Sequence, residues 1–189
     1  MRAALFSLLL SASAGYAATL EGIEVPGSIS LAGQNLVLNG AAVTRISIFK
    51  ADVVSLYVPA RKQSLEGVGD QPGPKRLQMV RLRDARGDDI ARKLISDFEA
   101  ASAPAERNNL INEMVQLGGM LSNRANKGDV LTLDWIPNQG LVISRNGVHL
   151  SEKPIASELL FRVLLRIFLG PKAPEDTREK LLGRRPWEE

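Results

Sequence analysis

Two opposite charges interrupt an apolar run in the first half of the chain, and they are the residues best placed to do chemistry. Within the run Ile46 to Val58, Lys50 and Asp52 share the alternation of Ile46, Ile48, Val54, Leu56 and Val58, so in one unbroken strand all would lie on the same face. Burying a charge without a partner is costly, so there the two would pair with each other or open onto a cavity. Such a cavity would hold a polar head group at the charges and an apolar chain at the aliphatic side chains. The other interpretation, which we prefer, is a turn near residues 49–51 that leaves both charges in water.

The remaining reactive side chains form no recognisable catalytic set. His149, the single histidine, follows the Asn146-Gly147 turn, so we expect it at the surface. The chain has no cysteine and no Gly-x-Ser-x-Gly sequence, which excludes thiol catalysis, disulfides and cysteine metal sites and gives no support for a serine nucleophile. One or two of the carboxylates Asp84, Asp88 and Asp89 are explained as helix caps, a cation site there being the weaker alternative. We predict no metal site and no cofactor.

The N-terminus has the pattern of a secretory signal. Arg2 precedes the apolar run Ala3 to Leu10, and small residues follow it. We predict that residues 1–18 are a signal peptide, and that cleavage follows Ala14, Ala17 or Ala18. No segment reaches the roughly 20 apolar residues that a membrane-spanning helix requires, so no transmembrane segment is expected. The mature protein should be exported, with the periplasm as its destination if the source is Gram-negative.

Composition predicts one domain without a polyanionic partner. The formal net charge is +3, and it falls to +2 when Arg2 is removed with the signal. Basic residues between positions 76 and 86 are interspersed with aspartates, and only 5% of the residues are aromatic, so a nucleic-acid site is not expected. We predict a single domain over residues 19–183 and a flexible tail over residues 184–189.

Apolar runs between turn residues predict strands, and apolar residues spaced by three or four predict helices. The expected strands are Leu20–Val25, Ser28–Leu31, Asn35–Val43, Ile46–Val58, Leu77–Leu82, Val130–Ile136, Leu141–Ser144 and a short one at Val148. The expected helices are a turn near Leu65, one through Ile90, Leu94 and Phe98 capped by Asp88 or Asp89, and then Leu110–Leu121, Ser157–Leu169 and Glu175–Leu182. The expected architecture is α+β, an antiparallel sheet with helices on one face.

An ordered series of short motifs resembles the bacterial chalcone isomerase-like family. The most informative is Leu38-Asn39-Gly40-Ala41-Ala42-Val43, which leads into a strand ending at Ser55-Leu56-Tyr57-Val58-Pro59. Further motifs follow in the family's order over roughly residues 20–183: Gly73-Pro74-Lys75-Arg76-Leu77, Lys127-Gly128-Asp129, Asn146-Gly147, Leu164 to Gly170 and Leu181-Leu182-Gly183. The resemblance implies the family's open-faced β-sandwich packed against a layer of helices.

The resemblance also implies where the catalytic residues of plant chalcone isomerases would stand, and this chain departs from each. Thr44 replaces the Arg expected directly after Ala42-Val43, with Arg45 one place later. On a regular strand that shift turns the side chain to the opposite face unless a bulge corrects it. Asp52 stands where a Thr is expected, and the Tyr and Asn expected at the start of the following helix are absent. We therefore predict no catalytic residues and, as candidate ligand-binding residues, Thr44, Arg45, Lys50 and Asp52.

Three functional hypotheses follow. The first is an exported, non-catalytic protein that binds a small apolar or amphipathic ligand in a cleft between sheet and helices; the family's fatty-acid-binding members imply a fatty acid. The second is an isomerase, an intramolecular lyase, with a divergent active site, which requires Arg45 and Asp52 to converge in one pocket. The third is an envelope protein that acts through protein partners, with a closed cleft and an exposed apolar patch elsewhere. The sequence favours the first and third over the second.

Overall fold

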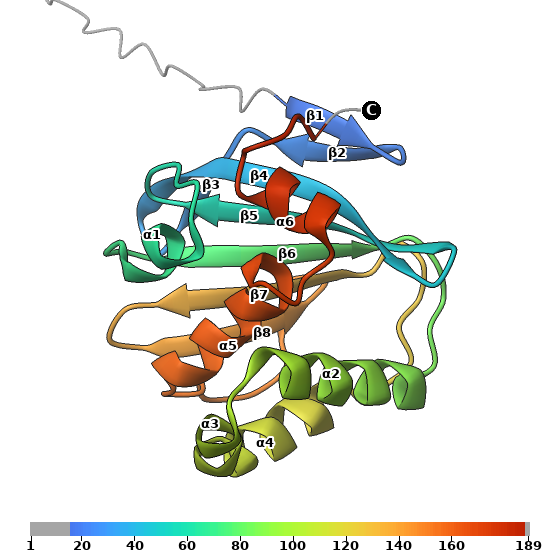
Figure 1. The fold of residues 1–189 in the computed structure, drawn as a ribbon, viewed down its shortest axis with the longest axis vertical. Coiled ribbons are helices and arrows are strands. Elements are labelled where there is room, and N and C mark those ends of the chain that lie inside the picture. Colours follow the sequence, from blue (N-terminus) through green and yellow to red (C-terminus); the bar gives the residue numbers. More distant parts are fainter. Residues whose placement is uncertain (1–15, 188–189) are drawn as a thin grey trace, which may run out of the picture.

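Alternating apolar and polar residues build a seven-stranded antiparallel sheet. The computed structural model describes residues 16–187, and the strands of this sheet lie in chain order, β3-β4-β5-β6-β7-β8-β9 (Figure 1). Their bounds are β3 Ser28–Leu31, β4 Gln34–Ile46, β5 Phe49–Val58, β6 Lys75–Arg81, β7 Val130–Ile136, β8 Gly140–Arg145 and β9 Val148–His149. Two further strands, β1 Tyr16–Leu20 and β2 Ile23–Pro26, pair only with each other among the described strands.

The helices pack against one face of the sheet and share a core with it. They are α1 Leu65–Asp70, α2 Gly87–Ala101, α3 Pro104–Asn109, α4 Ile111–Leu121, α5 Glu158–Leu169 and α6 Glu175–Leu181. Helix α5 buries more side chains than any other described helix, and it lies in front of β7 and β8 (Figure 1). Its buried side chains meet those of Leu56, Leu77 and Leu133 from the sheet. Burial of this apolar surface is the main stabilising contribution to the helix layer.

The opposite face of the sheet has its own core. Val53, Tyr57 and Val80 pack there against apolar side chains of β1, β2 and β3. Because β5 is buried on both faces, its sequence is nearly continuously apolar. The two cores confirm the predicted α+β architecture of an antiparallel sheet with helices on one face.

A bulge at Asn39 explains the Leu-Asn-Gly motif. The pairing of β4 with β5 shifts between Leu38 and Gly40. The Asn39 amide donates to the carbonyl oxygens of Lys62 at 2.9 Å and Leu181 at 2.7 Å, and its carbonyl oxygen accepts from the Lys62 N–H. Gly40 lies against the backbone at the end of α6, where a Cβ would stand 2.1 Å from the Lys180 carbonyl oxygen. The motif therefore anchors the last helix to the sheet.

Several expected boundaries were wrong for local reasons. The predicted strand Leu20–Val25 is interrupted at Glu21-Gly22, where both residues have positive φ and join β1 to β2. The predicted strand Ile46–Val58 is also divided, because Ser47, at φ 56°, and Ile48 form a hairpin turn. The predicted turn therefore exists, but it lies at Ser47-Ile48 and not near residues 49–51.

The helical region differs from expectation in two details. Asp88 and Asp89 are not caps, because the N-cap residue of α2 is Arg86. The two carboxylates lie in the first turn, where their negative charges interact favourably with the positive end of the helix dipole. A short additional helix, α3, begins at Pro104 and joins α2 to α4. Its proline stands at the first helical position, where the missing N–H has no partner to lose.

The two ends of the chain were predicted to be a signal peptide and a flexible tail. Most of the predicted signal peptide lies outside the described residues, but residues 16–18 belong to β1, so cleavage after Ala14 would leave this strand whole. In the predicted tail, the Arg184 Nε donates to the Gln63 carbonyl oxygen at 2.7 Å, and Arg61 lies over the Trp187 ring. No helix between residues 16 and 187 has the length and apolar character needed to cross a membrane.

Candidate functional site

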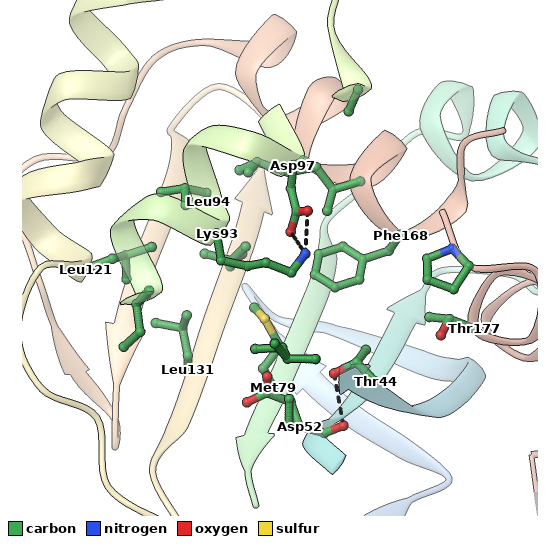
Figure 2. Close-up of a pocket in the computed structure, with 18 of the residues that line it drawn as sticks. Thr44, Asp52, Met79, Lys93, Leu94, Asp97, Leu121, Leu131, Phe168 and Thr177 are labelled. Atoms are coloured by element: carbon green, nitrogen blue, oxygen red, sulfur yellow. Dashed lines mark hydrogen bonds and ion pairs between the residues drawn. The ribbon is translucent and has the colours of Figure 1, made fainter. Parts of the chain in front are cut away.

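A cavity of about 240 Å³ lies between the sheet and the helix layer. Met79 and Leu131 line it from β6 and β7, Leu94 lines it from α2, and Phe168 from α5 (Figure 2). Most of its wall is apolar, but eight of the lining residues are charged: Arg45, Asp52, Arg81, Asp89, Lys93, Asp97, Arg166 and Lys172. This combination is typical of small-molecule sites, although the volume lies below the roughly 300–1,000 Å³ of drug-sized pockets. It suits a short chain or a compact apolar molecule.

Asp52 is the buried charge on the sheet side of this cavity. It shares a face with Val54 and Leu56, and its side chain is 14% exposed. Its Oδ1 lies 3.1 Å from the Arg81 Nε, which makes an ion pair, but the geometry is not that of a hydrogen bond and this oxygen accepts none from the described residues. Burial raises the pKa of the Asp52 carboxyl above its usual range, and the positive charge of Arg81 offsets part of that rise.

Thr44 lies directly opposite Asp52 in the β4–β5 ladder and also lines the cavity. Its hydroxyl donates to the Asp52 backbone carbonyl oxygen at 3.3 Å (Figure 2). The residue that replaces the expected Arg is therefore a small polar group on the cavity wall, and it leaves room where a guanidinium would stand.

An irregularity beside this pair separates Lys50 from Asp52. The β4–β5 pairing shifts between Thr44 and Arg45, and Ala51 is left without a partner in β4. The extra residue changes the alternation, so Lys50 pairs with Glu21 at the β1–β2 turn and does not line the cavity. The alternative in which Lys50 pairs with Asp52 is wrong for this reason, and so is the preferred expectation that Asp52 lies in water; the remaining alternative, a charge that opens onto a cavity, describes Asp52.

Arg45 is exposed, yet it belongs to the cavity wall together with Asp52. The structure therefore brings three of the four candidate residues to one cavity: Thr44, Arg45 and Asp52. Their role in ligand binding stays a prediction. The isomerase hypothesis required Arg45 and Asp52 in one pocket, and that requirement is met, but Arg81 is the cation that touches the carboxylate.

Sequence reasoning missed two arginines at this site. Arg81 belongs to the basic residues between positions 76 and 86, which gave no sign of a partner, whereas the β5–β6 register places it opposite Asp52. Arg166 lies within the helix that was expected at Ser157–Leu169. It lines the cavity and donates to Glu106 of α3 at 2.7 Å, while its Nε is buried without a hydrogen-bond partner among the described residues. Local periodicity carries no signal for either contact, because both depend on a second element.

Of the other candidate side chains, Asp89 lines the cavity, whereas His149, Asp84 and Asp88 do not. His149 is exposed on β9. Asp84, from the carboxylate cluster, accepts from the Lys127 N–H at 2.9 Å and from Arg124 at 2.6 Å. Across residues 16–187, no group of three or more histidine, cysteine or acidic side chains is arranged to hold a metal ion.

Asp52 is expected to link stability to pH in the opposite sense from Asp84. A raised folded-state pKa means that Asp52 contributes stability below about pH 4, and that this contribution is lost as pH rises through the folded pKa. Asp52→Asn should therefore gain stability relative to the wild type as pH is raised from about 4 toward neutrality. Urea unfolding at a series of pH values measures this difference.

Asp84→Asn is the matched control for this pH series. The Lys127 N–H and Arg124 lower the pKa of Asp84, so its contribution is present above about pH 4 and is lost as pH falls through its folded pKa. The Asp84→Asn variant should therefore lose stability relative to the wild type as pH is raised from below about 4 toward neutrality. An Asp52→Asn difference that is constant with pH would contradict the assignment of Asp52 as a desolvated carboxyl.

Comparisons with known proteins agree with this architecture. Residues 17–183 match the protein family described as chalcone isomerase-like. Among solved structures, the fold is similar to that of a fatty-acid-binding protein from Arabidopsis thaliana, with a TM-score of 0.66 and 11% sequence identity over 86% of this chain and 93% of that chain. At this identity the likeness concerns the fold alone. No curated protein sequence matches this chain at a significant level.

Proposed function

Because this chain belongs to the chalcone isomerase-like family, we propose that it is an exported, non-catalytic protein that binds a small apolar or amphipathic ligand between its sheet and its helices. The observation that carries the proposal is the largely apolar cavity, whose polar lining residues include Thr44, Asp52 and Arg81. A fatty acid is the first candidate, because a fatty-acid-binding protein shares the fold. Periplasmic location belongs to the same proposal and rests on the signal-like N-terminus.

The absence of the implied isomerase groups supports a binding role. Thr44 and Asp52 occupy the positions of an Arg and a Thr that hold and polarise the substrate in plant chalcone isomerases; Thr44 carries no positive charge, and the Asp52 side chain has no alcohol hydroxyl. Without these groups, the polarisation of the substrate during phenolate attack is lost. The alternative of a divergent isomerase is favoured by one observation, the convergence of Arg45 and Asp52 on one cavity. Incubation with a chalcone is expected to give no flavanone above the uncatalysed rate.

The third hypothesis required a closed cleft. A cavity of about 240 Å³ at the sheet–helix boundary favours ligand binding over that arrangement. Exposed apolar side chains do occur elsewhere, at Ile48 on the β4–β5 turn and at Ile111 and Val115 on α4. Scattered exposure of this kind is usual in soluble domains and does not by itself indicate a partner.

Native mass spectrometry tests the proposal directly. The mature protein is purified from its own cell envelope, and any bound molecule is then released by denaturing extraction and identified. We expect a stoichiometric mass addition from an apolar molecule. A clean apo mass, with no binding when lipids are added back, would refute the carrier role and favour the hypothesis of an interaction protein.

A further inference from the structure

The turn between β4 and β5 carries a cluster of exposed apolar side chains. Ile48 is 81% exposed, Phe49 53% and Ile46 47%, so three of the seven large apolar side chains exposed within residues 16–187 lie at positions 46–49. Turns of hairpins usually hold glycine, asparagine or aspartate, and an isoleucine gives the turn itself no advantage. A contiguous apolar group of this kind indicates an interaction site, whereas single exposed residues do not.

This part of the hairpin projects beyond the rest of the sheet. The pairing of β4 with β5 continues to Ile46 opposite Phe49, but β6 pairs with β5 only as far as Asp52. On the other side, β3 pairs with β4 only over residues 34–37. Figure 1 shows the turn extending past the end of β6. Residues 45–49, called the hairpin tip below, therefore have no described strand on either edge.

Positive charges flank the apolar side chains of the hairpin tip. The Arg83 guanidinium lies over the Phe49 ring, 4.4 Å from its centroid. Arg45 is exposed next to Ile46. Neither arginine forms an ion pair with a described carboxylate, and the neighbouring carboxylates Glu21 and Asp52 are already paired with other cations. The tip therefore combines an apolar end with two unneutralised cations.

An anionic lipid bilayer fits this combination better than a protein partner does. Apolar side chains can enter the acyl region while arginine side chains extend their guanidinium groups to the depth of the lipid phosphates. A stable protein interface buries roughly 800 Å² on each partner. Three side chains at a projecting turn supply only part of such an area.

The hairpin tip also adjoins the cavity. Arg45 and Ile46 line the cavity and are exposed to solvent, so the cavity reaches the surface beside the tip. We propose that the tip inserts its apolar side chains into an anionic lipid bilayer and holds the mouth of the cavity at the bilayer surface. This inference goes beyond the proposed function, because it adds a surface from which an apolar ligand enters the cavity without crossing water.

Vesicle co-sedimentation tests the inference with protein purified from its own cell envelope. The vesicles contain phosphatidylcholine with phosphatidylglycerol, or phosphatidylcholine alone. We expect the wild type to bind the mixed vesicles more tightly, and added salt to weaken that binding because it screens the charges. Ile48→Ser should lower the partition coefficient on mixed vesicles by about tenfold or more, since one large aliphatic side chain no longer leaves water. A wild type that binds neither vesicle would overturn the inference.

Ile111→Ser is the matched control, because Ile111 is 58% exposed on α4, away from the hairpin tip (Figure 1). Its partition coefficient should stay within about twofold of the wild-type value. Both variants have the same N-terminus, so an uncleaved signal cannot produce a difference between them. Arg83→Gln should lose about fivefold on mixed vesicles and little on phosphatidylcholine alone. Equal losses for Ile48→Ser and Ile111→Ser would contradict docking through the tip.

Titration with octanoate in solution separates this inference from the carrier role. Ile48 does not line the cavity, so Ile48→Ser should bind octanoate as the wild type does. If the wild type binds octanoate but no vesicles, the docking inference fails and the carrier role stands. If vesicle binding depends on Ile48 but neither octanoate nor mass spectrometry reveals a ligand, the carrier role fails and the docking inference stands. A concentration-dependent dimer that Ile48→Ser abolishes would assign the tip to a second copy of the chain and overturn the inference.

Discussion

Leu94→Trp is expected to lower the affinity for the cavity ligand by at least about tenfold while leaving the fold intact. Leu94 lies on α2 and lines the cavity (Figure 2). A tryptophan ring there occupies much of a space of only about 240 Å³. Because the empty volume accepts the larger side chain, the free energy of unfolding should stay within about 1 kcal/mol of the wild-type value.

Ile95→Trp is the control for this experiment. Ile95 is the next residue of the same helix and is 53% exposed, so the same enlargement occurs in solvent. Titration with the molecule identified by mass spectrometry, or with a short-chain fatty acid, compares the two variants with the wild type. Equal affinity of Leu94→Trp and Ile95→Trp would show that the ligand binds elsewhere, and the cavity would lose its assigned role.

Gly40→Ala is expected to destabilise the protein by about 3 kcal/mol or more, the range of severe overpacking. The added Cβ would lie 2.1 Å from the Lys180 carbonyl oxygen and 2.6 Å from that of Leu181. Backbone atoms cannot rotate away as a side chain can, so the end of α6 must move off the sheet. The same movement breaks the hydrogen bond from Asn39 to the Leu181 carbonyl oxygen.

Gly119→Ala provides the matched glycine substitution. Gly119 is exposed within α4, and a Cβ added there meets no atom within 4 Å. Alanine is a better helix former than glycine, so this variant should gain about 0.5–1 kcal/mol. Urea unfolding of both variants gives the two free energies. A loss below about 1 kcal/mol for Gly40→Ala would contradict the close approach of α6 to β4.

The pattern of the chain predicted the type of most elements because each type depends on local spacing. The apolar run Ser157–Leu169 was expected to be a helix, and α5 occupies Glu158–Leu169 with Ser157 as its N-cap. The alternation at Val130–Ile136 likewise predicted β7. Errors arose at tight turns such as Glu21-Gly22 and Ser47-Ile48, where a non-glycine residue adopts positive φ and no proline marks the break.

The candidate site was only partly predictable for a different reason. Asp52 stood out because a carboxylate in an apolar run needs an explanation, and that argument required nothing beyond the sequence. Its partner did not stand out. Lys50, two residues away, was the nearest opposite charge, but the unpaired Ala51 turns Lys50 toward Glu21. One unpaired residue in β5, Ala51, was therefore enough to separate Lys50 from Asp52.

The sequence by itself determined that Asp52 is an unusual charge, that the architecture is α+β, and that Thr44 and Asp52 stand where the resemblance leads one to expect Arg and Thr, because all three depend on residue type and local order. The tertiary structure alone decided that Arg81 neutralises Asp52, that Arg166 reaches the cavity and that space remains between sheet and helices. These depend on strand register and on the distance between layers, which are set by contacts among residues far apart in the chain. The function proposed here rests on that space.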